Sequence, residues 1–334
     1  MTTRHNAWET EPFKDSLVSI GTHSLYLRAR GPPRDQPSSL HPVVIVESGL
    51  GAGHAYWAAV HRMLSASTRV YCYDRAGLGR SGVSPRSRSA ENMAAELLDL
   101  LEAVDMKPPY VLLAHSYGGI ISREFLHLMQ LRYHDIEGLD HPVVGMVLAD
   151  CNTEHTHIEN PIPADSLRAM MQGLDVMRVT GLAGSHKFTE AEMSEFYDSM
   201  SQPNNEAESG KEEENMLPSS HTLASKKQLD KAPLSPFPVT VIKGNNSGDL
   251  EKIFKAAVAN GSGTDEDRER VLQCKNVFVA SEERWQRAQL QLSNNSRYVF
   301  ISDTGHNPHM THPDVVADEV LKVVEQAKTL LRSS

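Results

Sequence analysis

The feature that most constrains the fold of this chain is a series of short, continuously apolar runs, each of which ends in turn-forming residues. Runs of this kind are typical of strands that are buried on both faces of a parallel sheet. Helical patterns lie between them, and this alternation predicts an α/β fold with a mostly parallel central sheet flanked by helices. The strands are expected at residues 42–46, 68–73, 110–114, 142–149, 238–242 and 297–301, and the helices at about 54–65, 89–105, 117–132 and 314–332.

The ends of this pattern and its one interruption predict the domain organisation. Residues 16–30 contain two β-rich runs around Gly21 and are expected to form a hairpin. Residues 151–236 contain no convincing buried strand, several short amphipathic patterns and the acidic stretch SQPNNEAESGKEEEN. We expect that stretch to be a solvated, mobile loop. The prediction is a core made of residues 1–150 and 237–334, with residues 151–236 as a helical cap over the carboxyl ends of the strands.

Composition and charge exclude several classes of function. The chain has 43 acidic and 33 basic residues and a net charge of −10, which argues against a nucleic-acid partner because phosphate binding needs concentrated cations. The N-terminal stretch MTTRHNAWETEPFKD lacks the apolar core of a secretory signal, and no apolar run reaches the length of a membrane span. An odd number of cysteines, Cys72, Cys151 and Cys274, favours free thiols in a reducing compartment. We therefore expect a cytoplasmic protein.

The strongest chemical signal is Ser116, which lies where the apolar run Leu112-Leu113-Ala114 passes into a helical pattern. A serine at a sharp strand-to-helix turn presents its hydroxyl above the sheet, and the turn requires small neighbours, here Ala114 and Gly118. The helix that follows favours negative charge near its first turn. The alternative is a serine that only caps the helix. The context favours Ser116 as a nucleophile.

Two further segments occur in the order that such a nucleophile requires. The loop Ser48-Gly49-Leu50-Gly51 follows the first buried strand, and its glycines allow the backbone to approach a substrate oxygen. The backbone N–H groups of Leu50 and Tyr117 are therefore candidates for an oxyanion hole. His306 follows the last strand directly after Gly305, which makes it the candidate general base for Ser116.

Together these motifs resemble the α/β-hydrolase superfamily, in particular its esterase-, lactonase- and thioesterase-like members. The resemblance covers nearly the whole chain apart from the cap, and it implies hydrolysis without a metal or organic cofactor. Haloalkane dehalogenases and epoxide hydrolases of this fold use an Asp at the position of Ser116, so the serine argues against both. The motifs are Val46-Glu47-Ser48-Gly49-Leu50-Gly51, Tyr73-Asp74-Arg75-Ala76-Gly77-Leu78-Gly79-Arg80-Ser81, the Ser116 turn, Gly305-His306 and Pro313.

The acid that would orient His306 has two candidates. In much of the superfamily it follows the strand before the last, where this chain has Asp249 slightly late and no carboxylate at Asn246 or Ser247. The other known placement is the end of the preceding strand, where Asp150 stands. An Asp that closes a buried strand needs a partner, because an unpaired buried carboxylate is costly. We favour Asp150, with Asp249 as the alternative; a third possibility is that Asp150 only caps the following loop.

These residues predict acyl transfer from an ester, lactone or thioester through an acyl-Ser116 intermediate. One alternative is a thioesterase-like cyclase or acyltransferase that releases a polyketide-type acyl chain, including by lactone formation. A second alternative is a non-catalytic receptor for a small molecule in the cap. The substrate is expected to be a small acyl compound.

Two other clusters suggest ligands. Histidines recur at residues 155, 157, 306, 309 and 312, but the spacing matches no strong zinc motif and Pro308 interrupts helical presentation, so no metal is predicted. Arg80, Arg86 and Arg88 follow Asp74 in a loop at the carboxyl edge of the sheet and are expected to face solvent. A basic rim there would suit a coenzyme A or carrier-protein thioester as the acyl donor.

Overall fold

The computed structural model describes residues 6–35, 38–134 and 141–333, and within them eight strands form one sheet. The order of the strands is β1-β2-β4-β3-β5-β6-β7-β8. β1, β2 and β4 pair antiparallel, whereas all neighbouring pairs from β4 to β8 are parallel. This confirms the predicted fold class, including the N-terminal hairpin. The strands are β1 (Phe13–Ser19), β2 (Ser24–Arg30), β3 (Val43–Glu47), β4 (Val70–Tyr73), β5 (Tyr110–His115), β6 (Val143–Ala149), β7 (Val239–Lys243) and β8 (Ser296–Phe300).

The register of the central strands brings their carboxyl ends to one edge of the sheet. Glu47 at the end of β3 pairs with Ala114 of β5, and His115 at the end of β5 pairs with Ala149 of β6. All residues of these three strands are buried. Loops that leave this edge therefore start close together, as required for a site built from several strands.

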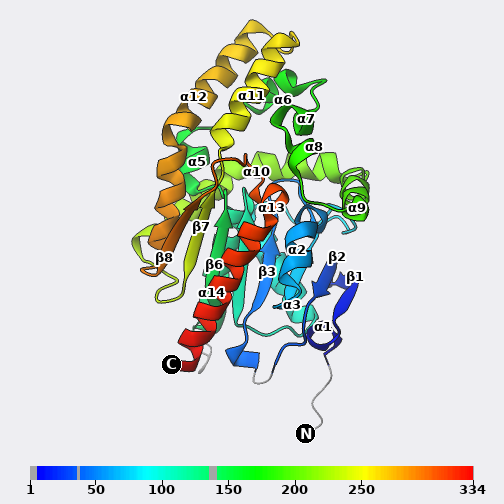
Figure 1. The fold of residues 1–334 in the computed structure, drawn as a ribbon, viewed down its shortest axis with the longest axis vertical. Helices are drawn as coiled ribbons and strands as arrows, with labels where there is room; N and C mark the ends of the chain where they lie inside the picture. The colour runs from blue at the N-terminus through cyan, green and yellow to red at the C-terminus, as the bar shows by residue number, and fades with distance from the viewer. Residues whose placement is uncertain (1–5, 36–37, 135–140, 334) are drawn as a thin grey trace.

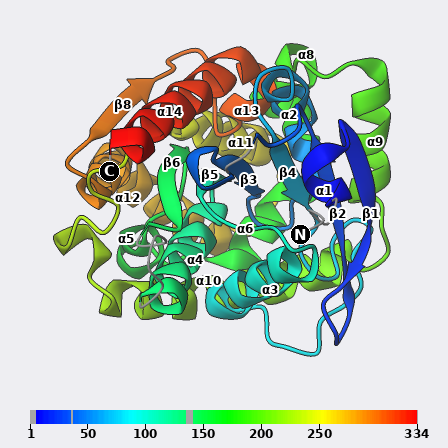
Figure 2. The same cartoon turned by 90° about the horizontal axis from the view of Figure 1, so that it is seen from below.

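Helices cover both faces of the sheet, as seen along the strands in Figure 2, where α2 and α14 lie on one side and α3 and α4 on the other. Val316, Val320, Val323 and Val324 of α14 are buried against the sheet at spacings of one helical face. The helices of these layers are α2 (Ala58–Leu64), α3 (Ala90–Ala103), α4 (Gly118–Tyr133) and α14 (Pro313–Ser333), with the short helix α1 (Ala7–Thr10) near the N-terminus and 3₁₀ turns at Ser38–Leu40, His54–Trp57, Gln228–Asp230 and Gln289–Leu292.

The remaining helices gather beyond the carboxyl ends of the strands, where α10 crosses above the sheet and α11 and α12 rise beside α6 (Figure 1). They connect β6 to β7 and β7 to β8, with one short helix after β8. They are α5 (Glu154–Glu159), α6 (Ala164–Met171), α7 (Val176–Thr180), α8 (Leu182–Ser185), α9 (Glu190–Met200), α10 (Asn205–Ser225), α11 (Asn246–Ala259), α12 (Asp265–Ala288) and α13 (Pro308–Thr311).

The acidic stretch at residues 201–215, expected to be a mobile loop, instead forms the first half of helix α10 from Asn205 onward, so that prediction was wrong. Glu208 and Glu212 are one turn apart and both are buried, with exposed fractions of 3% and 0%. Glu208 pairs with Lys211, and Glu212 forms an ion pair with Arg75 of the core at 2.7 Å. The charge run resembled a solvated segment because the cation that stabilises its buried face is distant in the sequence.

The long helices α11 and α12 lie within the stretch that the sequence assigned to the core. In the structure they pack against each other and against α6, and α12 also contacts α5. We therefore propose that residues 246–288 belong structurally with the cap segment 151–236. Among the described residues, no helix combines the length and the apolar character needed to traverse a bilayer.

Candidate active site

Ser116 occupies a tight turn between β5 and α4. Its φ is +53°, a left-handed conformation that a side chain adopts at a cost and that is common at functional turns. Gly118 is required here, because an added Cβ would lie 2.5 Å from the backbone oxygen of Glu47. At Gly119 an added Cβ would lie 2.5 Å from the Cβ of Cys151. Close packing of the turn thus leaves the Ser116 hydroxyl at the edge of the sheet, before the first turn of α4.

The structure brings Ser116, His306 and Asp150 together in one hydrogen-bonded chain. The Nε2 atom of His306 lies 3.0 Å from Ser116 Oγ, and its Nδ1 atom lies 2.6 Å from Asp150 Oδ2. Asp150 directly follows β6, and its other oxygen accepts a hydrogen bond of 3.2 Å from the backbone N–H of Gly244. Because an ionised carboxylate can only accept, Nδ1 of His306 carries the proton and Nε2 is free to accept one from Ser116.

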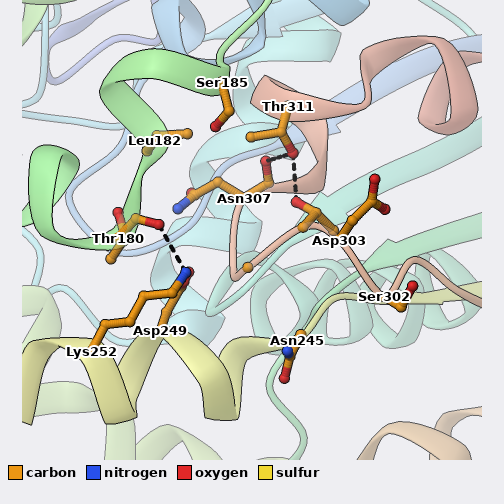
Figure 3. Close-up of a pocket in the computed structure, with 12 residues that line it drawn as sticks. Thr180, Leu182, Ser185, Asn245, Asp249, Lys252, Ser302, Asp303, Asn307 and Thr311 are labelled. Atoms are coloured by element: carbon orange, nitrogen blue, oxygen red, sulfur yellow. Dashed lines mark hydrogen bonds and ion pairs between the residues drawn. The ribbon is translucent and has the colours of Figure 1, made fainter.

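Asp249, the alternative acid, bonds to the backbone of His306, whereas the described partners of the ring nitrogens are Asp150, Asn246 and Ser116. Asp249 Oδ2 accepts a hydrogen bond of 3.0 Å from the backbone N–H of His306, and its Oδ1 lies 3.3 Å from Lys252 Nζ. Figure 3 shows these two side chains on α11 beside a polar cavity of about 160 Å³, with Lys252 bonded to the backbone oxygen of Thr180. The carboxylate therefore holds the loop of His306, whereas Asp150 holds its ring.

The pKa values of the histidines near Ser116 are shifted in opposite directions. Burial opposes protonation of His306, but the hydrogen bond and charge of Asp150 outweigh it and raise its pKa. Burial lowers the pKa of His115 well below its usual value and that of His309 to about 3. The ring centroid of His115 lies 4.6 Å from that of His306 and 4.3 Å from that of His309. The lowered pKa values of His115 and His309 favour neutral imidazoles, and His115 lies between His309 and the one imidazole that a carboxylate prepares for protonation.

The candidate oxyanion-hole residues, Leu50 and Tyr117, line the same cavity as Ser116 and His306. Leu50 lies in the loop after β3 and Tyr117 directly follows Ser116 at the end of the neighbouring strand β5, so the two backbones lie at the same edge of the sheet. Within the part of the chain that the structure describes, neither backbone N–H donates to a protein acceptor. Both are therefore available to a substrate oxygen.

The cavity above Ser116 has a volume of about 260 Å³, and α11, α12 and the segment 152–170 form most of its wall. On each helix, four of the lining residues stand at positions i, i+3, i+4 and i+7, which form one face of a helix, and Asn246 at the start of α11 also lines the cavity. The sequence analysis missed these residues, although their spacing could have identified two helices that each have one apolar face. They are Leu250, Ile253, Phe254 and Ala257 on α11, and Val271, Cys274, Lys275 and Phe278 on α12.

The predicted basic rim is not present as such, because acidic partners neutralise its arginines. Arg88 is buried, with 1% of its surface exposed, and its Nη1 donates to Glu96 at 2.9 Å. Arg86 pairs with Asp99 at 3.1 Å, and Arg80 lies 3.4 Å from Glu195. The three arginines do not line the cavity that contains Ser116. The expectation that all three face solvent was wrong, and the structure gives no support for a coenzyme A or carrier-protein donor.

The other histidines are distributed among separate contacts. His155 pairs with Glu159 at 3.1 Å, His312 pairs with Asp303 at 3.4 Å, and His157 is buried in the wall of the cavity. Across the residues described, no three His, Cys, Asp or Glu side chains form a group that could hold a metal ion.

Known proteins resemble the chain over most of its length. Residues 43–319 match a family described as the alpha/beta hydrolase family. A Gibberella zeae protein named "AB hydrolase superfamily protein" is 37% identical over 334 residues, covering 96% of this chain and 99% of the relative. A Hormonema carpetanum protein named "Probable transporter efuK" is 33% identical over 97% of this chain, which spans 44% of that longer protein. A thermophilic esterase from Thermogutta terrifontis superposes with a TM-score of 0.55 at 18% identity, over 94% of this chain and 99% of the esterase.

Proposed function

Because the chain belongs to the alpha/beta hydrolase family, as its motifs predicted, we propose that it is a serine hydrolase that cleaves an ester, lactone or thioester through an acyl intermediate on Ser116. The observation that carries the proposal is the hydrogen-bonded chain from Ser116 Oγ through His306 to Asp150, with distances of 3.0 and 2.6 Å. A nucleophile, a base and an orienting acid in this order are what acyl transfer requires.

The proposed reaction uses each of these groups at a defined atom. Ser116 Oγ attacks the carbonyl carbon of the substrate while its proton passes to Nε2 of His306. Asp150 stabilises the resulting imidazolium through Nδ1, and the N–H groups of Leu50 and Tyr117 bind the oxyanion. The imidazolium then gives its proton to the leaving alcohol or thiol. Water repeats the sequence on the acyl-enzyme and restores the free hydroxyl of Ser116.

The cavity supports an apolar acyl group as the part of the substrate that it holds. The residues that α11 and α12 contribute are largely aliphatic or aromatic, and Met170 and Met216 close the cavity from α6 and α10. Burial of an acyl chain among them would stabilise the complex by roughly 0.8 kcal/mol for each methylene group. Phe254 and Phe278 are well placed to set the shape that the chain must adopt.

The test is covalent labelling with a fluorophosphonate together with turnover of p-nitrophenyl esters of increasing acyl length. We expect the wild type to be labelled and to turn over at least one ester, and Ser116→Ala to lose both while keeping its melting temperature. Product analysis separates release of the free acid from cyclisation. Ligand binding by a wild type that neither labels nor turns over any ester would show that the pocket serves as a receptor instead.

A further inference from the structure

The peptide between Gly49 and Leu50 is held from its carbonyl side by Arg75, which lies in the loop after the neighbouring strand β4. The oxygen of Gly49 accepts hydrogen bonds from Arg75 Nη2 at 2.5 Å and from the backbone N–H of Ala52 at 3.2 Å. A trans peptide is planar, so its C=O and its N–H point in opposite directions. Fixing the oxygen of Gly49 therefore fixes the direction of the Leu50 N–H, the group assigned to the oxyanion hole.

Arg75 can hold this peptide rigidly because all five of its N–H donors are in use. Nη1 donates to Glu47 at 2.8 Å and to the backbone oxygen of Ser48 at 2.7 Å, while Nη2 also serves Gly49. Nε and the second N–H of Nη2 donate to the two carboxylate oxygens of Glu212 at 2.7 and 2.8 Å. A guanidinium with five satisfied donors has no freedom to rotate away from the loop.

Glu212 comes from helix α10 of the cap and acts on the loop at two points. Its exposed fraction is 0%, so its charge depends on these partners. Besides Arg75, its Oε2 accepts a hydrogen bond of 2.9 Å from the backbone N–H of Gly51. A single carboxylate of the cap thus fixes the arginine behind the Leu50 peptide and the peptide that follows it.

Helix α10 packs so closely against the loops after β3 and β4 that side chains are not accommodated at two positions of these loops. An added Cβ at Gly51, whose φ is +63°, would lie 2.3 Å from the hydroxyl of Ser209. At Gly77, with a φ of +76°, an added Cβ would lie 2.3 Å from Cγ of Glu208. Two glycines with left-handed backbones therefore allow α10 to rest directly on the loops after β3 and β4.

We propose that Glu212 is a positioning residue that makes the oxyanion hole depend on the seating of cap helix α10. The inference rests on the proposed function and adds a role for the cap in the chemical step, beyond substrate binding. Its basis is the continuous path from Glu212 through Arg75 to the Gly49–Leu50 peptide.

The test uses E212Q with E195Q as a matched control. A glutamine offers one acceptor oxygen, so in either orientation of its amide one N–H of Arg75 faces an amide donor, and in one of the two orientations the Gly51 N–H does so as well. Arg75 keeps Glu47 as its ionic partner in this variant, so we expect the fold to persist. Glu195 likewise joins this helical segment to the sheet, through Arg28 at 2.6 Å and His54 at 3.2 Å, but among the described residues it bonds to none of residues 48–51 in the loop of Leu50.

We expect E212Q to lower kcat for a p-nitrophenyl ester about 10- to 100-fold, somewhat less than removal of an oxyanion donor itself. Affinity for an alkyl trifluoromethyl ketone, which forms a tetrahedral adduct with serine, should fall by the same factor. KM should stay within about threefold of the wild type, since the cavity for the acyl group is unchanged. In E195Q both kcat and ketone affinity should stay within about threefold.

The proposal is overturned if E212Q keeps the kcat of the wild type, if it changes KM alone, or if E195Q loses kcat and ketone affinity equally. Should E212Q fail to fold, E212D keeps the charge but shortens the reach to Gly51, and the same paired loss is expected there; an unchanged kcat in E212D would then reject the role. A wild type without labelling or turnover would instead reject the proposed function.

Discussion

The central strands and helix α10 both bury side chains, but they do so by different means. β5 and β6 are buried throughout, and their side chains are almost entirely apolar. α10 buries Met216 and Leu223 together with Glu208 and Glu212. Apolar burial can be read from hydropathy along the chain, whereas burial through an ion pair depends on a partner elsewhere, here Arg75, which lies 137 residues from Glu212. The comparison shows which parts of such a protein a local pattern can predict.

The largest expected effect is on catalysis, and it distinguishes Asp150 at the end of β6 from Asp249 on α11 as the acid that orients His306. Asp150→Asn should lower kcat/KM by about 10²-fold or more, because an amide no longer holds the Nδ1 proton or stabilises the imidazolium of His306. Asp249→Asn keeps an oxygen for the backbone N–H of His306 and should cost less than about tenfold. The measurement is ester hydrolysis by both variants, with melting temperatures as a control for folding.

The pH profile of kcat/KM is a second way to distinguish Asp150 from Asp249. Catalysis needs neutral His306, so kcat/KM should fall as the pH drops through its pKa, which Asp150 holds above the usual imidazole value. In Asp150→Asn the acidic limb should move to lower pH, because the charge that stabilises the imidazolium is gone. Asp249→Asn could instead show the greater loss of kcat/KM and the greater shift of the acidic limb. That result would assign the acid to Asp249 of α11 rather than to Asp150 at the end of β6.

A second pair of variants separates stability from selectivity. Leu27 of β2 is buried in the main core, with 1% exposed, and Leu27→Ala should cost about 2 to 5 kcal/mol of unfolding free energy without changing substrate preference. Leu167 of α6 is half-buried and lines the cavity, so Leu167→Ala should cost about 1 kcal/mol. It should also shift the preferred p-nitrophenyl ester toward longer or bulkier acyl groups.

Urea denaturation and the profile of activity against acyl length measure the two effects. An altered profile in Leu27→Ala, or an unaltered one in Leu167→Ala, would contradict the assignment of selectivity to the cap.

The sequence predicted the strands closely because their signal is local. The runs at 110–114 and 142–149 became β5 (Tyr110–His115) and β6 (Val143–Ala149), and both lead directly to Ser116 and Asp150. The meeting of these residues with His306 could be predicted because parallel strands share one carboxyl edge. The cavity was not predicted: the apolar faces of α11 and α12 have a clear helical spacing, but no local signal indicates that they face Ser116.

The last comparison concerns two arginines of the loop after β4, Arg86 and Arg88, which looked equivalent in the sequence. Arg88 and Glu96 have side chains that are 1% and 2% exposed, so Arg88→Gln leaves a buried carboxylate without its cation. The expected cost is about 3 to 5 kcal/mol. Arg86 and Asp99 are 36% and 35% exposed, and solvent screens their attraction, so Arg86→Gln should cost less than about 1 kcal/mol. Urea denaturation of both variants measures the difference directly.

Arg86→Gln also tests, independently of stability, whether the arginines of this loop recognise a coenzyme A donor. Because neither arginine lines the cavity, folded Arg86→Gln should retain the kcat/KM of the wild type for a coenzyme A thioester and for a small neutral thioester of the same acyl group, at low and at high salt. A selective loss on the coenzyme A thioester that shrinks as salt rises would restore the basic rim as a recognition site. Equal stability losses in the two variants would mean that burial does not distinguish the arginines, and that charged residues of this loop can be treated alike, as the sequence suggested.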